Sequence, residues 1–474
     1  MRNRPPAIAI AMLILSLVLC APALAARDQV TVVQTTANLH DALSVQSPQA
    51  FTARRARHSV VIRVDPSVRY QRITGFGAAM TDSSAWLLYD ELTPAWRAAT
   101  MSALFGAGGI HLNFLRIPMG ASDYTVSSTP YSYDDLLSGQ TDPTLADFSI
   151  AHDEAYILPA LREALAVNPG VFTLANPWSP PPWMKANDTF DNVGLDGSVQ
   201  PQYYGALAQY FVKFIQAYQA QGVPIDAITP MNEPNSNSPY PGSALMPDAD
   251  ATFLPQDLAP ALGAAGLHPT IFGDDDTELS DAQALLSGPA APTLGGIAFH
   301  CYQGMGQMTS LHDEYPSEPI VLSECSPGII PYAPAEVPID ATRNWASGVQ
   351  LWNLALDTSG GPYGAAMGCP GCTGVVTVNT QTHTPSFGLN YYEYGQTSKF
   401  VQPGAVRIYS TRLVSDGDGV TPGVDDVAFV NPDGSKVLVA YNSRARAARL
   451  AVDWRGRYVN WTLPGKGTVT LIWR

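Results

Sequence analysis

The stretch Ala227-Ile228-Thr229-Pro230-Met231-Asn232-Glu233-Pro234 places a carboxylate directly after a short apolar run. A second stretch, Ile320-Val321-Leu322-Ser323-Glu324-Cys325, has the same form. Short apolar runs of this kind are typical of buried strands, and α/β sheets display their chemistry where parallel strands end. The two stretches therefore predict an α/β fold in which Glu233 and Glu324 lie at strand ends.

The alternative for these two residues is an ordinary solvated surface charge, because the chain has 41 Asp and Glu residues and most acids are exposed. The neighbours of Glu233 and Glu324 are apolar or small rather than charged. A carboxylate held at the end of a core strand is costly and needs a reason. Two carboxylates facing one cleft are what glycoside hydrolysis requires, because one protonates the departing oxygen while the other attacks or stabilises the sugar cation.

From about residue 72 to residue 358, short apolar runs alternate with helical patterns such as the one from Tyr203 to Ala220. This alternation is the signature of repeated βα units and predicts a (β/α)₈ TIM barrel. Glu233 would end the fourth strand and Glu324 the seventh. The eight predicted strands are Ile73 to Ala78, Leu112 to Ile117, Val171 to Ala175, Ala227 to Met231, Thr270 to Gly273, Gly296 to His300, Ile320 to Ser323, and Gly348 to Asn353.

From about Val375 the pattern changes to short alternating runs separated by turns, including the hairpin turn Asn431-Pro432-Asp433-Gly434. This predicts an attached antiparallel β-sandwich, to which residues 28–34 and Val60 to Val64 are expected to add strands. Its other predicted strands are Ala405 to Tyr409, Asp426 to Val430, Lys436 to Asn442, Arg449 to Asp453, and Thr468 to Trp473. The predicted domains are a signal peptide (1–26), N-terminal strands (27–71), the catalytic barrel (72–374) and the C-terminal sandwich (375–474).

The N-terminus predicts a secretory signal: Arg2 and Arg4 precede an apolar stretch from Ala7 to Leu19 and then a run of small residues. A membrane anchor is the alternative, but this stretch is too short to span a bilayer, and no later run of about 18 apolar residues occurs. Lipidation at Cys20 is disfavoured by the bulky residue before it. We therefore expect a secreted protein, periplasmic or extracellular, without a stable membrane anchor.

The formal charge of −15, from 26 Lys and Arg against 41 Asp and Glu, disfavours nucleic acid and anionic membrane surfaces as partners. A neutral glycan fits this balance, although net charge alone does not single out sugar.

Four cysteines remain after the signal, which allows three pairings. A local bridge within Cys369-Pro370-Gly371-Cys372 is favoured over redox or zinc use, because a lone CxxC lacks a second ligand pair. Cys301 and Cys325 are either free thiols or a bridge between neighbouring strands. Asp274-Asp275-Asp276 suggests a cation site, but adjacent carboxylates do not converge on one point, so capping or substrate binding is preferred. No metal or cofactor is expected.

Seven motifs occur in order along the chain: Gly75 to Asp82, Leu115 to Met119 with Ser122-Asp123-Tyr124, Pro177 to Pro180 with Trp183-Met184-Lys185, Asn232-Glu233-Pro234, His300-Cys301-Tyr302, Ser323-Glu324-Cys325, and Trp352 to Asp357. Together they resemble glycoside hydrolase family 30, which includes glucosylceramidases and endo-β-1,6-glucanases. The resemblance implies a retaining β-glycosidase with a (β/α)₈ barrel and a β-sandwich built from both chain ends.

The resemblance makes Glu233 the general acid/base and Glu324 the nucleophile, with carboxyl groups about 5 to 5.5 Å apart. Asn232 is expected to bind the sugar 2-hydroxyl, with a strand-end cap as its alternative. Arg116 is expected either to orient Glu324 or to form a structural salt bridge. Asp123 resembles a sugar-hydroxyl ligand of the −1 subsite, and a loop turn is its alternative.

Four aromatic residues complete the candidate site. Trp178 and Trp352 offer flat faces for a pyranose, or else fill the barrel mouth. Tyr302 is expected to hydrogen-bond the nucleophile. His300 is interpreted as a satisfied barrel histidine rather than a proton carrier.

The preferred function is a secreted retaining β-glycosidase that hydrolyses β-glucosidic bonds and is glucosylceramidase-like or endo-β-1,6-glucanase-like. Cys301 stands where the glucosylceramidase branch usually has tryptophan, which predicts a changed wall of the sugar site. A β-1,6-galactanase or xylanase of the same family is the alternative. The stretch Thr358 to Gln381 has no Lys or Arg to hold a uronic acid, which argues against a glucuronoxylanase. A non-catalytic glycan-binding barrel and a metal-assisted hydrolase are further alternatives, and exo or endo cleavage stays open.

Overall fold

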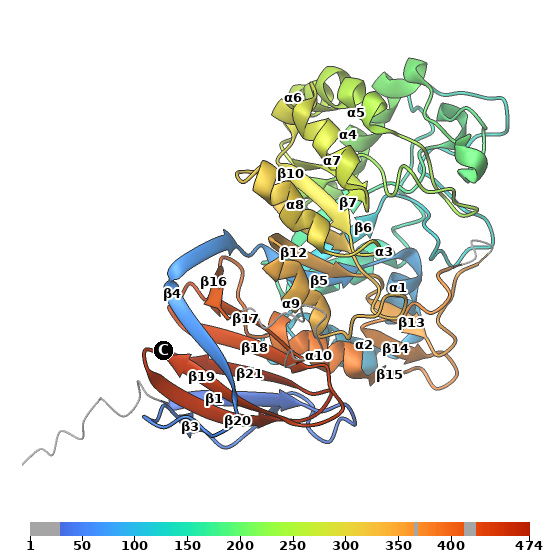
Figure 1. Cartoon of the computed structure of the whole chain (residues 1–474). Coiled ribbons are helices and arrows are strands. Elements are labelled where there is room, and N and C mark those ends of the chain that lie inside the picture. The colour runs from blue at the N-terminus through green and yellow to red at the C-terminus, as the bar shows by residue number, and fades with distance from the viewer. Residues whose placement is uncertain (1–28, 365–367, 412–422) are drawn as a thin grey trace, which may run out of the picture.

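The computed structural model describes residues 29–364, 368–411 and 423–474. These residues form a closed parallel barrel of eight strands and a ten-stranded sheet arranged as a β-sandwich (Figure 1). The predicted fold class is therefore confirmed. The predicted signal, residues 1–26, lies outside the described residues.

All eight predicted barrel strands are present. The ring closes between β12 and β5, where Gly348 lies opposite Gly75 and Leu351 opposite Ala78. Neither glycine leaves room for a side chain, because a Cβ at Gly75 would meet Asn113 and one at Gly348 would meet the ring of Phe114. The strands are β5 (Gly75–Ala79), β6 (Phe114–Pro118), β7 (Phe172–Asn176), β8 (Ala227–Ile228), β9 (Thr270–Asp276), β10 (Gly296–His300), β11 (Ile320–Glu324) and β12 (Ala346–Leu351).

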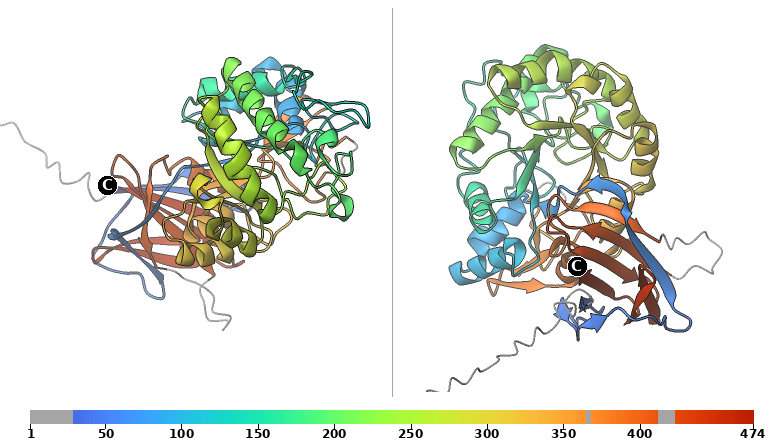
Figure 2. Two further views of the ribbon diagram at one scale, coloured as in Figure 1. Left: turned by 90° about the horizontal axis from the view of Figure 1, so that it is seen from above. Right: turned by 90° about the vertical axis from the view of Figure 1, so that its left-hand side faces the viewer.

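Helices surround the barrel strands (Figure 2). The predicted helix from Tyr203 to Ala220 is found as α4 (Tyr204–Ala220), and its buried stripe includes Leu207, Phe211 and Phe214. Such a stripe, apolar every three or four residues, buries one helix face on the barrel. The other α-helices are α1 (Asp82–Trp86), α2 (Pro94–Phe105), α3 (Ile157–Val167), α5 (Pro247–Phe253), α6 (Ala259–Ala264), α7 (Leu279–Ser287), α8 (Gly306–Glu314), α9 (Glu336–Arg343) and α10 (Leu389–Ser398).

Both chain ends build the sandwich, as predicted. β1 pairs with the last strand, β21, and β4 lies between β16 and β19. β20 was not among the predicted strands. The sheet consists of β1 (Gln29–Thr35), β2 (Ser44–Val45), β3 (Gln49–Ala50), β4 (Val60–Arg72), β16 (Val406–Ser410), β17 (Val424–Val430), β18 (Lys436–Asn442), β19 (Ala448–Trp454), β20 (Arg457–Leu463) and β21 (Thr468–Trp473).

The sandwich shares a core with the barrel. On β17, Val427 and Phe429 pack into the barrel core, whereas Ala428 packs into the interior of the sandwich. β18 alternates in the same way. A sheet that is buried on both faces ties the two regions together, because separating them would expose apolar surface on one side.

A small sheet of β13 (Ala355–Asp357), β14 (Val376–Asn379) and β15 (Thr384–Phe387) continues the chain after β12. Among the described helices, none has the length and apolar character needed to cross a bilayer.

Candidate active site

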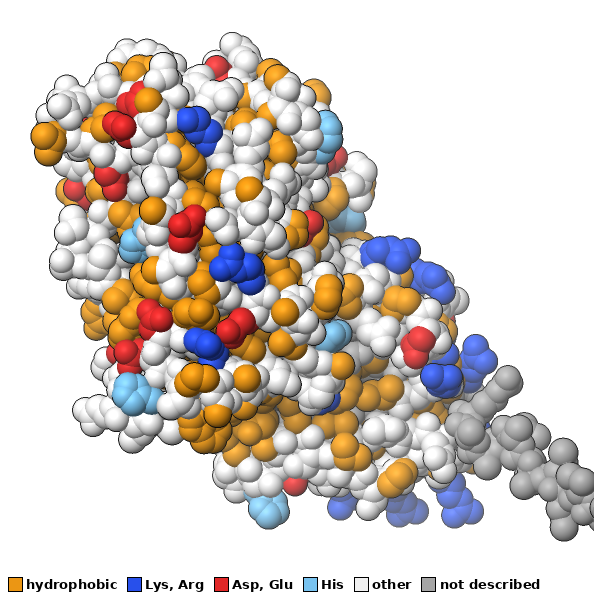
Figure 3. Space-filling view, turned by 180° about the vertical axis from the view of Figure 1, so that it is seen from behind, with side chains coloured by type: hydrophobic (Ala, Val, Ile, Leu, Met, Phe, Trp, Pro, Cys, Tyr) orange, Lys and Arg blue, Asp and Glu red, His pale blue; other side chains and the backbone are white. Residues whose placement is uncertain are grey.

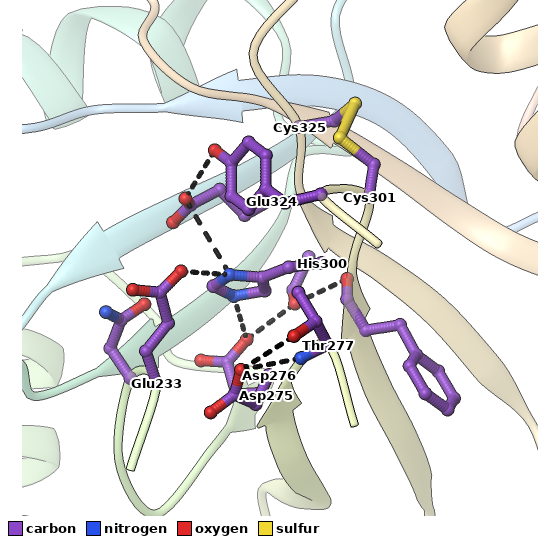
Figure 4. A network of polar contacts seen from close by, with 12 residues as sticks. Glu233, Asp275, Asp276, Thr277, His300, Cys301, Glu324 and Cys325 are labelled. Carbon is purple, nitrogen blue, oxygen red and sulfur yellow. Dashed lines mark hydrogen bonds and ion pairs between the residues drawn. A yellow bond between two sulfur atoms is a disulfide. The ribbon is translucent and has the colours of Figure 1, made fainter. Parts of the chain in front are cut away.

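The structure brings Glu233 and Glu324 together at the carboxyl ends of the barrel strands (Figure 4). Glu324 ends β11, and Glu233 lies in the loop that follows β8. One carboxylate oxygen of each residue and one ring nitrogen of His300 all lie within 4.8 Å of one another. Both side chains keep some exposure, 17% for Glu233 and 8% for Glu324. The pair therefore faces one accessible site from opposite sides.

Two donors fix Glu324. The Arg116 guanidinium donates Nη1–H to Glu324 Oε2, and the Tyr302 hydroxyl donates to Oε1 at 2.7 Å. Arg116 comes from β6 and is fully buried. A charge-assisted contact on one oxygen and a phenol on the other leave the carboxylate little freedom to rotate.

Glu233 has different partners. Its Oε1 lies 3.0 Å from His300 Nδ1, and its Oε2 lies 3.5 Å from the Tyr240 hydroxyl. Glu233 has a φ of 43°, in the left-handed region. Its backbone N–H donates to the Asp275 carbonyl at 3.1 Å, which helps to hold this unfavourable conformation. No guanidinium contacts Glu233 among the described residues, so the two carboxylates differ in their electrostatic surroundings.

Asp275 connects the strands behind the pair. Its two oxygens accept hydrogen bonds from side chains of five different segments, and it has no exposed surface. The donors are Arg116 Nη2 (2.9 Å), Asn176 Nδ2 (2.9 Å), Thr229 Oγ1 (2.6 Å), Ser323 Oγ (2.5 Å) and His300 Nε2 (3.2 Å). Burial opposes ionisation, but Arg116 and His300 outweigh it and hold the pKa of Asp275 below its usual value.

His300 links this buried carboxylate to the pair, since its other nitrogen contacts Glu233. Burial would lower the pKa of His300, but Glu324, Asp275 and Glu233 together raise it well above its usual value. The imidazolium therefore balances the charge of the surrounding carboxylates. The interpretation of His300 as a satisfied barrel histidine did not include its contact with Glu233.

The pairing of the barrel strands is irregular in two places, next to Asp275 and next to His300. The register between β9 and β10 shifts at Asp275, and the register between β10 and β11 shifts between Phe299 and His300. Asp275 has a φ of 80°. Bulges of this kind re-aim side chains next to active sites, and here they turn Asp275 toward the barrel axis.

The three consecutive acids do not converge. Asp276 accepts from the backbone N–H groups of Asn235 and Thr277, and Asp274 Oδ2 has no partner among the described residues. Burial, then Glu233, raises the pKa of Asp276 to about 6.

The pair opens into a cavity of about 480 Å³. Asn232 Oδ1 accepts from Arg116 Nη2 at 2.7 Å. Asp123 is 6% exposed, and its Oδ1 has no partner within the described ranges. Burial, together with Glu324 and Glu233, raises the pKa of Asp123 well above its usual value.

Seven of the predicted site residues line this cavity, and the other two, Arg116 and His300, lie behind it. The seven are Asp123, Trp178, Asn232, Glu233, Tyr302, Glu324 and Trp352.

Trp178 and Trp352 stack on each other with ring centroids 5.0 Å apart, and the Arg116 guanidinium lies 4.6 Å from the Trp178 ring. Sequence reasoning missed the rim of the cavity. This rim consists of Tyr240, residues 329–331 and residues 368–370. The aromatic Tyr240, seven residues after Glu233, was the available signal for the first of these.

Both cysteine pairs form bridges, which confirms the local Cys369–Cys372 bridge and resolves the open question for Cys301–Cys325. Cys301 is 1% exposed and does not line the cavity. Cys301 itself forms no part of the cavity wall, because its sulfur points to Cys325, away from the two glutamates (Figure 4). Cys369 lies on the cavity rim, where its backbone carbonyl accepts from the Tyr124 hydroxyl at 3.2 Å.

Glu233, His300 and Glu324 also have the spacing of a metal site. Their ligand atoms are already engaged by one another, by Arg116 and by Tyr302, and the buried guanidinium beside Glu324 opposes a further cation. These side chains therefore suit proton transfer and nucleophilic attack by carboxylates better than metal binding.

Comparison with known proteins decides the family. Residues 73–380 match the glycosyl hydrolase family 30 TIM-barrel domain, and residues 404–471 match the family's β-sandwich domain. The chain belongs to glycosyl hydrolase family 30. It is 34% identical to an endo-1,6-β-D-glucanase of Neurospora crassa, over 85% of this chain and 87% of that protein.

Other members of the family are also similar. Lysosomal acid glucosylceramidase of Mus musculus is 28% identical, covering 90% of this chain and 85% of that protein. A solved structure described as an endo-β1,6-glucanase has a TM-score of 0.81 and 30% identity, covering 94% of this chain and 99% of that one. SrfJ of Salmonella typhimurium has a TM-score of 0.85 and 25% identity over 94% and 99% of the chains. This family 30 member is a glycoside hydrolase that acts on β-glycans.

Proposed function

We propose that the protein is an exported endo-β-1,6-glucanase that cleaves with retention, using Glu324 as nucleophile and Glu233 as general acid/base. The observation that carries the mechanism is the pair itself: two carboxylates with oxygens within 4.8 Å and different partners, facing one cavity. Retaining enzymes need their carboxyl groups only about 5 to 5.5 Å apart, whereas inverting enzymes leave room for a water molecule.

In the first step, Glu324 attacks the anomeric carbon. Arg116 and Tyr302 orient its carboxylate, so that little reorganisation is needed when the bond forms. Glu233 gives its proton to the departing glycosidic oxygen. His300 donates to Glu233 Oε1, which leaves Oε2 as the oxygen that carries the proton into the cavity.

In the second step, Glu233 has become a carboxylate and accepts a proton from water. That water attacks the same anomeric carbon and releases Glu324. Two inversions give overall retention. The imidazolium of His300 stabilises the new negative charge on Glu233 at 3.0 Å.

The remaining residues bind the sugar at the point of cleavage. Because Arg116 occupies Asn232 Oδ1, the amide NH₂ is the group left to donate to a 2-hydroxyl. Asp123, whose pKa is raised, can donate to or accept from a second hydroxyl. Trp178 and Trp352 contribute apolar faces to the same cavity.

Similarity to endo-1,6-β-glucanases, at 34% identity in sequence and a TM-score of 0.81 in structure, supports the β-1,6-glucan substrate and internal cleavage. Glucosylceramide is the second candidate, supported by the 28% identity to the mouse lysosomal enzyme. The apolar rim contributed by Ile329, which is 49% exposed, could contact a lipid chain. The predicted signal supports export.

The test is a substrate panel of linear β-1,6-glucan, laminarin, glucosylceramide, β-1,6-galactan and glucuronoxylan, with the Glu324→Gln variant as a blank. We expect rapid cleavage of the β-1,6-glucan, with a ladder of oligosaccharides before glucose accumulates. Faster turnover of glucosylceramide, or release of glucose alone from the first minutes, would contradict the proposed substrate or the proposed internal cleavage.

A further inference from the structure

Charge is distributed very unevenly between the two regions. Residues 73–403, which contain the barrel, have 7 Lys and Arg against 32 Asp and Glu. Residues 29–72 and 404–474, which build the sandwich, have 16 Lys and Arg against 8 Asp and Glu. Although the whole chain has a net charge of −15, the sandwich segments are therefore basic. Figure 3 shows Lys and Arg side chains gathered over the sandwich end of the molecule.

Five exposed arginines come from two adjacent segments of the sandwich. Arg54, Arg55 and Arg57 precede β4, Arg446 precedes β19, and Arg449 is the second residue of β19. We call these five residues the arginine face. β4 and β19 are paired in parallel, with Val60 opposite Leu450, so the two segments lie side by side.

The arginine face is not neutralised within the described residues. None of its five guanidinium groups has a carboxylate oxygen within 4.0 Å, whereas Arg63 pairs with Asp65 at 3.2 Å and Arg474 with Asp433 at 3.5 Å. Clustered like charges repel one another and attract counter-ions. A cluster of arginines that none of the described acids reaches is suited to an external anion.

The surface beside these arginines is hollowed. One hollow, of about 630 Å³, is lined by His58, Arg446 and Arg449. A second, of about 400 Å³, also contains Arg449 and is lined by Asn460 and Trp461. Because Arg449 lines both hollows, the two lie next to each other, and we call them together the groove.

The second hollow has the groups that bind sugars. Trp461 is half-buried, and its indole N–H donates to Gln34 Oε1 at 3.0 Å, which fixes the ring. Gln49 adds an amide group and Thr462 a hydroxyl. The Asn460 amide instead holds the preceding loop, because it accepts from the Ala56 N–H at 2.7 Å and donates to the Arg54 carbonyl at 3.0 Å. Aromatic faces and planar amides contact pyranose rings, while guanidinium groups pair with carboxylates or phosphates.

We propose that this groove binds an anionic polysaccharide, a glycan that carries carboxylate or phosphate groups, at a site separate from the cleavage site. This goes beyond the proposed function and does not depend on the linkage that is cleaved. The role is to hold the enzyme in a charged glycan matrix while the barrel cleaves a neutral glucan. A groove with an amide and an indole ring fits a sugar chain better than the flat surface of a bilayer.

The experiment measures binding of the full chain to polygalacturonate by calorimetry. Neutral β-1,6-glucan, vesicles with phosphatidylglycerol and duplex DNA serve as comparison ligands. The test variant is Arg446→Gln/Arg449→Gln. The matched control is Arg63→Gln/Arg474→Gln, which removes the same charge from the same region but outside the groove.

We expect wild type to bind polygalacturonate in preference to the vesicles and DNA, with affinity that falls as NaCl rises from 50 to 500 mM, values chosen because salt screens exposed charges. The test variant should raise Kd by roughly tenfold or more, and the control by less than about twofold. Hydrolysis of an aryl β-glucoside should stay the same in all three proteins, which separates this site from the cleavage site.

Equal loss in the test and control variants would show a general charge effect and overturn the proposal. Tighter binding to vesicles or DNA than to polygalacturonate would assign the groove to a different polyanion and would also overturn it. Absence of binding to polygalacturonate by wild type at 50 mM NaCl, the low-salt condition in which exposed charges act furthest, has the same consequence.

Discussion

The barrel and the sandwich use charge in opposite ways. At the barrel mouth, the buried cations Arg116 and His300 each form ion pairs with Asp275 and Glu324. On the sandwich, the arginine face is exposed and unmatched by the described acids. Buried charges that are paired hold atoms in place at the cost of desolvation, whereas exposed charges act at a distance and are screened by salt. The first arrangement suits bond cleavage, and the second suits attachment to a polymer.

Replacing the proposed nucleophile should abolish cleavage in the barrel and leave glycan binding by the sandwich unchanged. Glu324→Gln should lower kcat/KM by about 10⁴-fold on every glycan that wild type cleaves, because the covalent route is lost. Polygalacturonate binding should be unchanged. Steady-state kinetics and calorimetry on the same preparation check both halves, and activity within tenfold of wild type would remove Glu324 from the mechanism.

Asp275→Asn should show how much the buried network contributes. Arg116 and His300 would lose their shared anion, so we expect unfolding to cost roughly 3–5 kcal/mol less and kcat to fall about a hundredfold as the site shifts. Because the native pKa of Asp275 is lowered, its stabilisation is present above its unfolded pKa and is lost as pH falls through its folded pKa. Urea unfolding at pH 7 and at successively lower pH measures this: the loss should be full at pH 7 and should shrink only as the pH falls below the unfolded pKa of about 4.

The neighbouring Asp274 supplies the control. It is equally buried, but burial followed by the surrounding acids Asp276, Asp281 and Asp275 raises its pKa well above the usual value. A raised pKa favours the uncharged acid, which an amide resembles, so the expected change for Asp274→Asn is within about 1 kcal/mol. Equal effects at positions 274 and 275 would mean that the network has no special role.

The junction between the two regions should be sensitive to pH through Glu393. This residue lies on α10, which contacts both β5 of the barrel and β21 of the sandwich. Burial raises its pKa to about 7 from 4.5. Between these values the folded protein keeps a proton that the unfolded chain releases, so the free energy of unfolding falls as pH rises, by roughly 1–3 kcal/mol.

Glu393→Gln should remove that dependence and make the protein more stable than wild type at pH 8. Thermal unfolding at pH 5 and pH 8 tests it, and Glu314→Gln on the exposed end of α8 serves as the control. A variant that stays as pH-dependent as wild type would place the responsible group elsewhere.

The fold was largely predictable because its signals are local. Apolar runs of four to six residues separated by helical stripes appear directly in the sequence, and so do the alternating runs after Val375. β20 was missed, although it pairs with β19 along its full length, from Leu463 opposite Ala448 to Arg457 opposite Trp454. Whether a short segment such as β20 becomes a strand depends on the strand it pairs with, and its own residues do not reveal that partner.

For the site, the motifs named most of the residues that line the cavity, including Asp123 and Tyr302. They did not show the central position of Asp275 or the contact between His300 and Glu233. Both depend on register shifts between β9, β10 and β11, and a one-residue shift reverses the direction of a side chain. For Cys301 and Cys325 the sequence allowed either free thiols or a bridge between neighbouring strands, and the pairing of β10 with β11 decides for the bridge.

The central claim is that Glu324 forms a covalent bond to the sugar while Glu233 moves the proton. Incubation with 2-deoxy-2-fluoro-β-glucosyl fluoride, followed by proteolysis and mass spectrometry, tests it most directly. We predict one fluoroglucosyl group per chain, carried by the peptide that contains Ser323-Glu324-Cys325. A label on Glu233, or turnover of a β-glucan to products of inverted configuration without any label, would contradict the account.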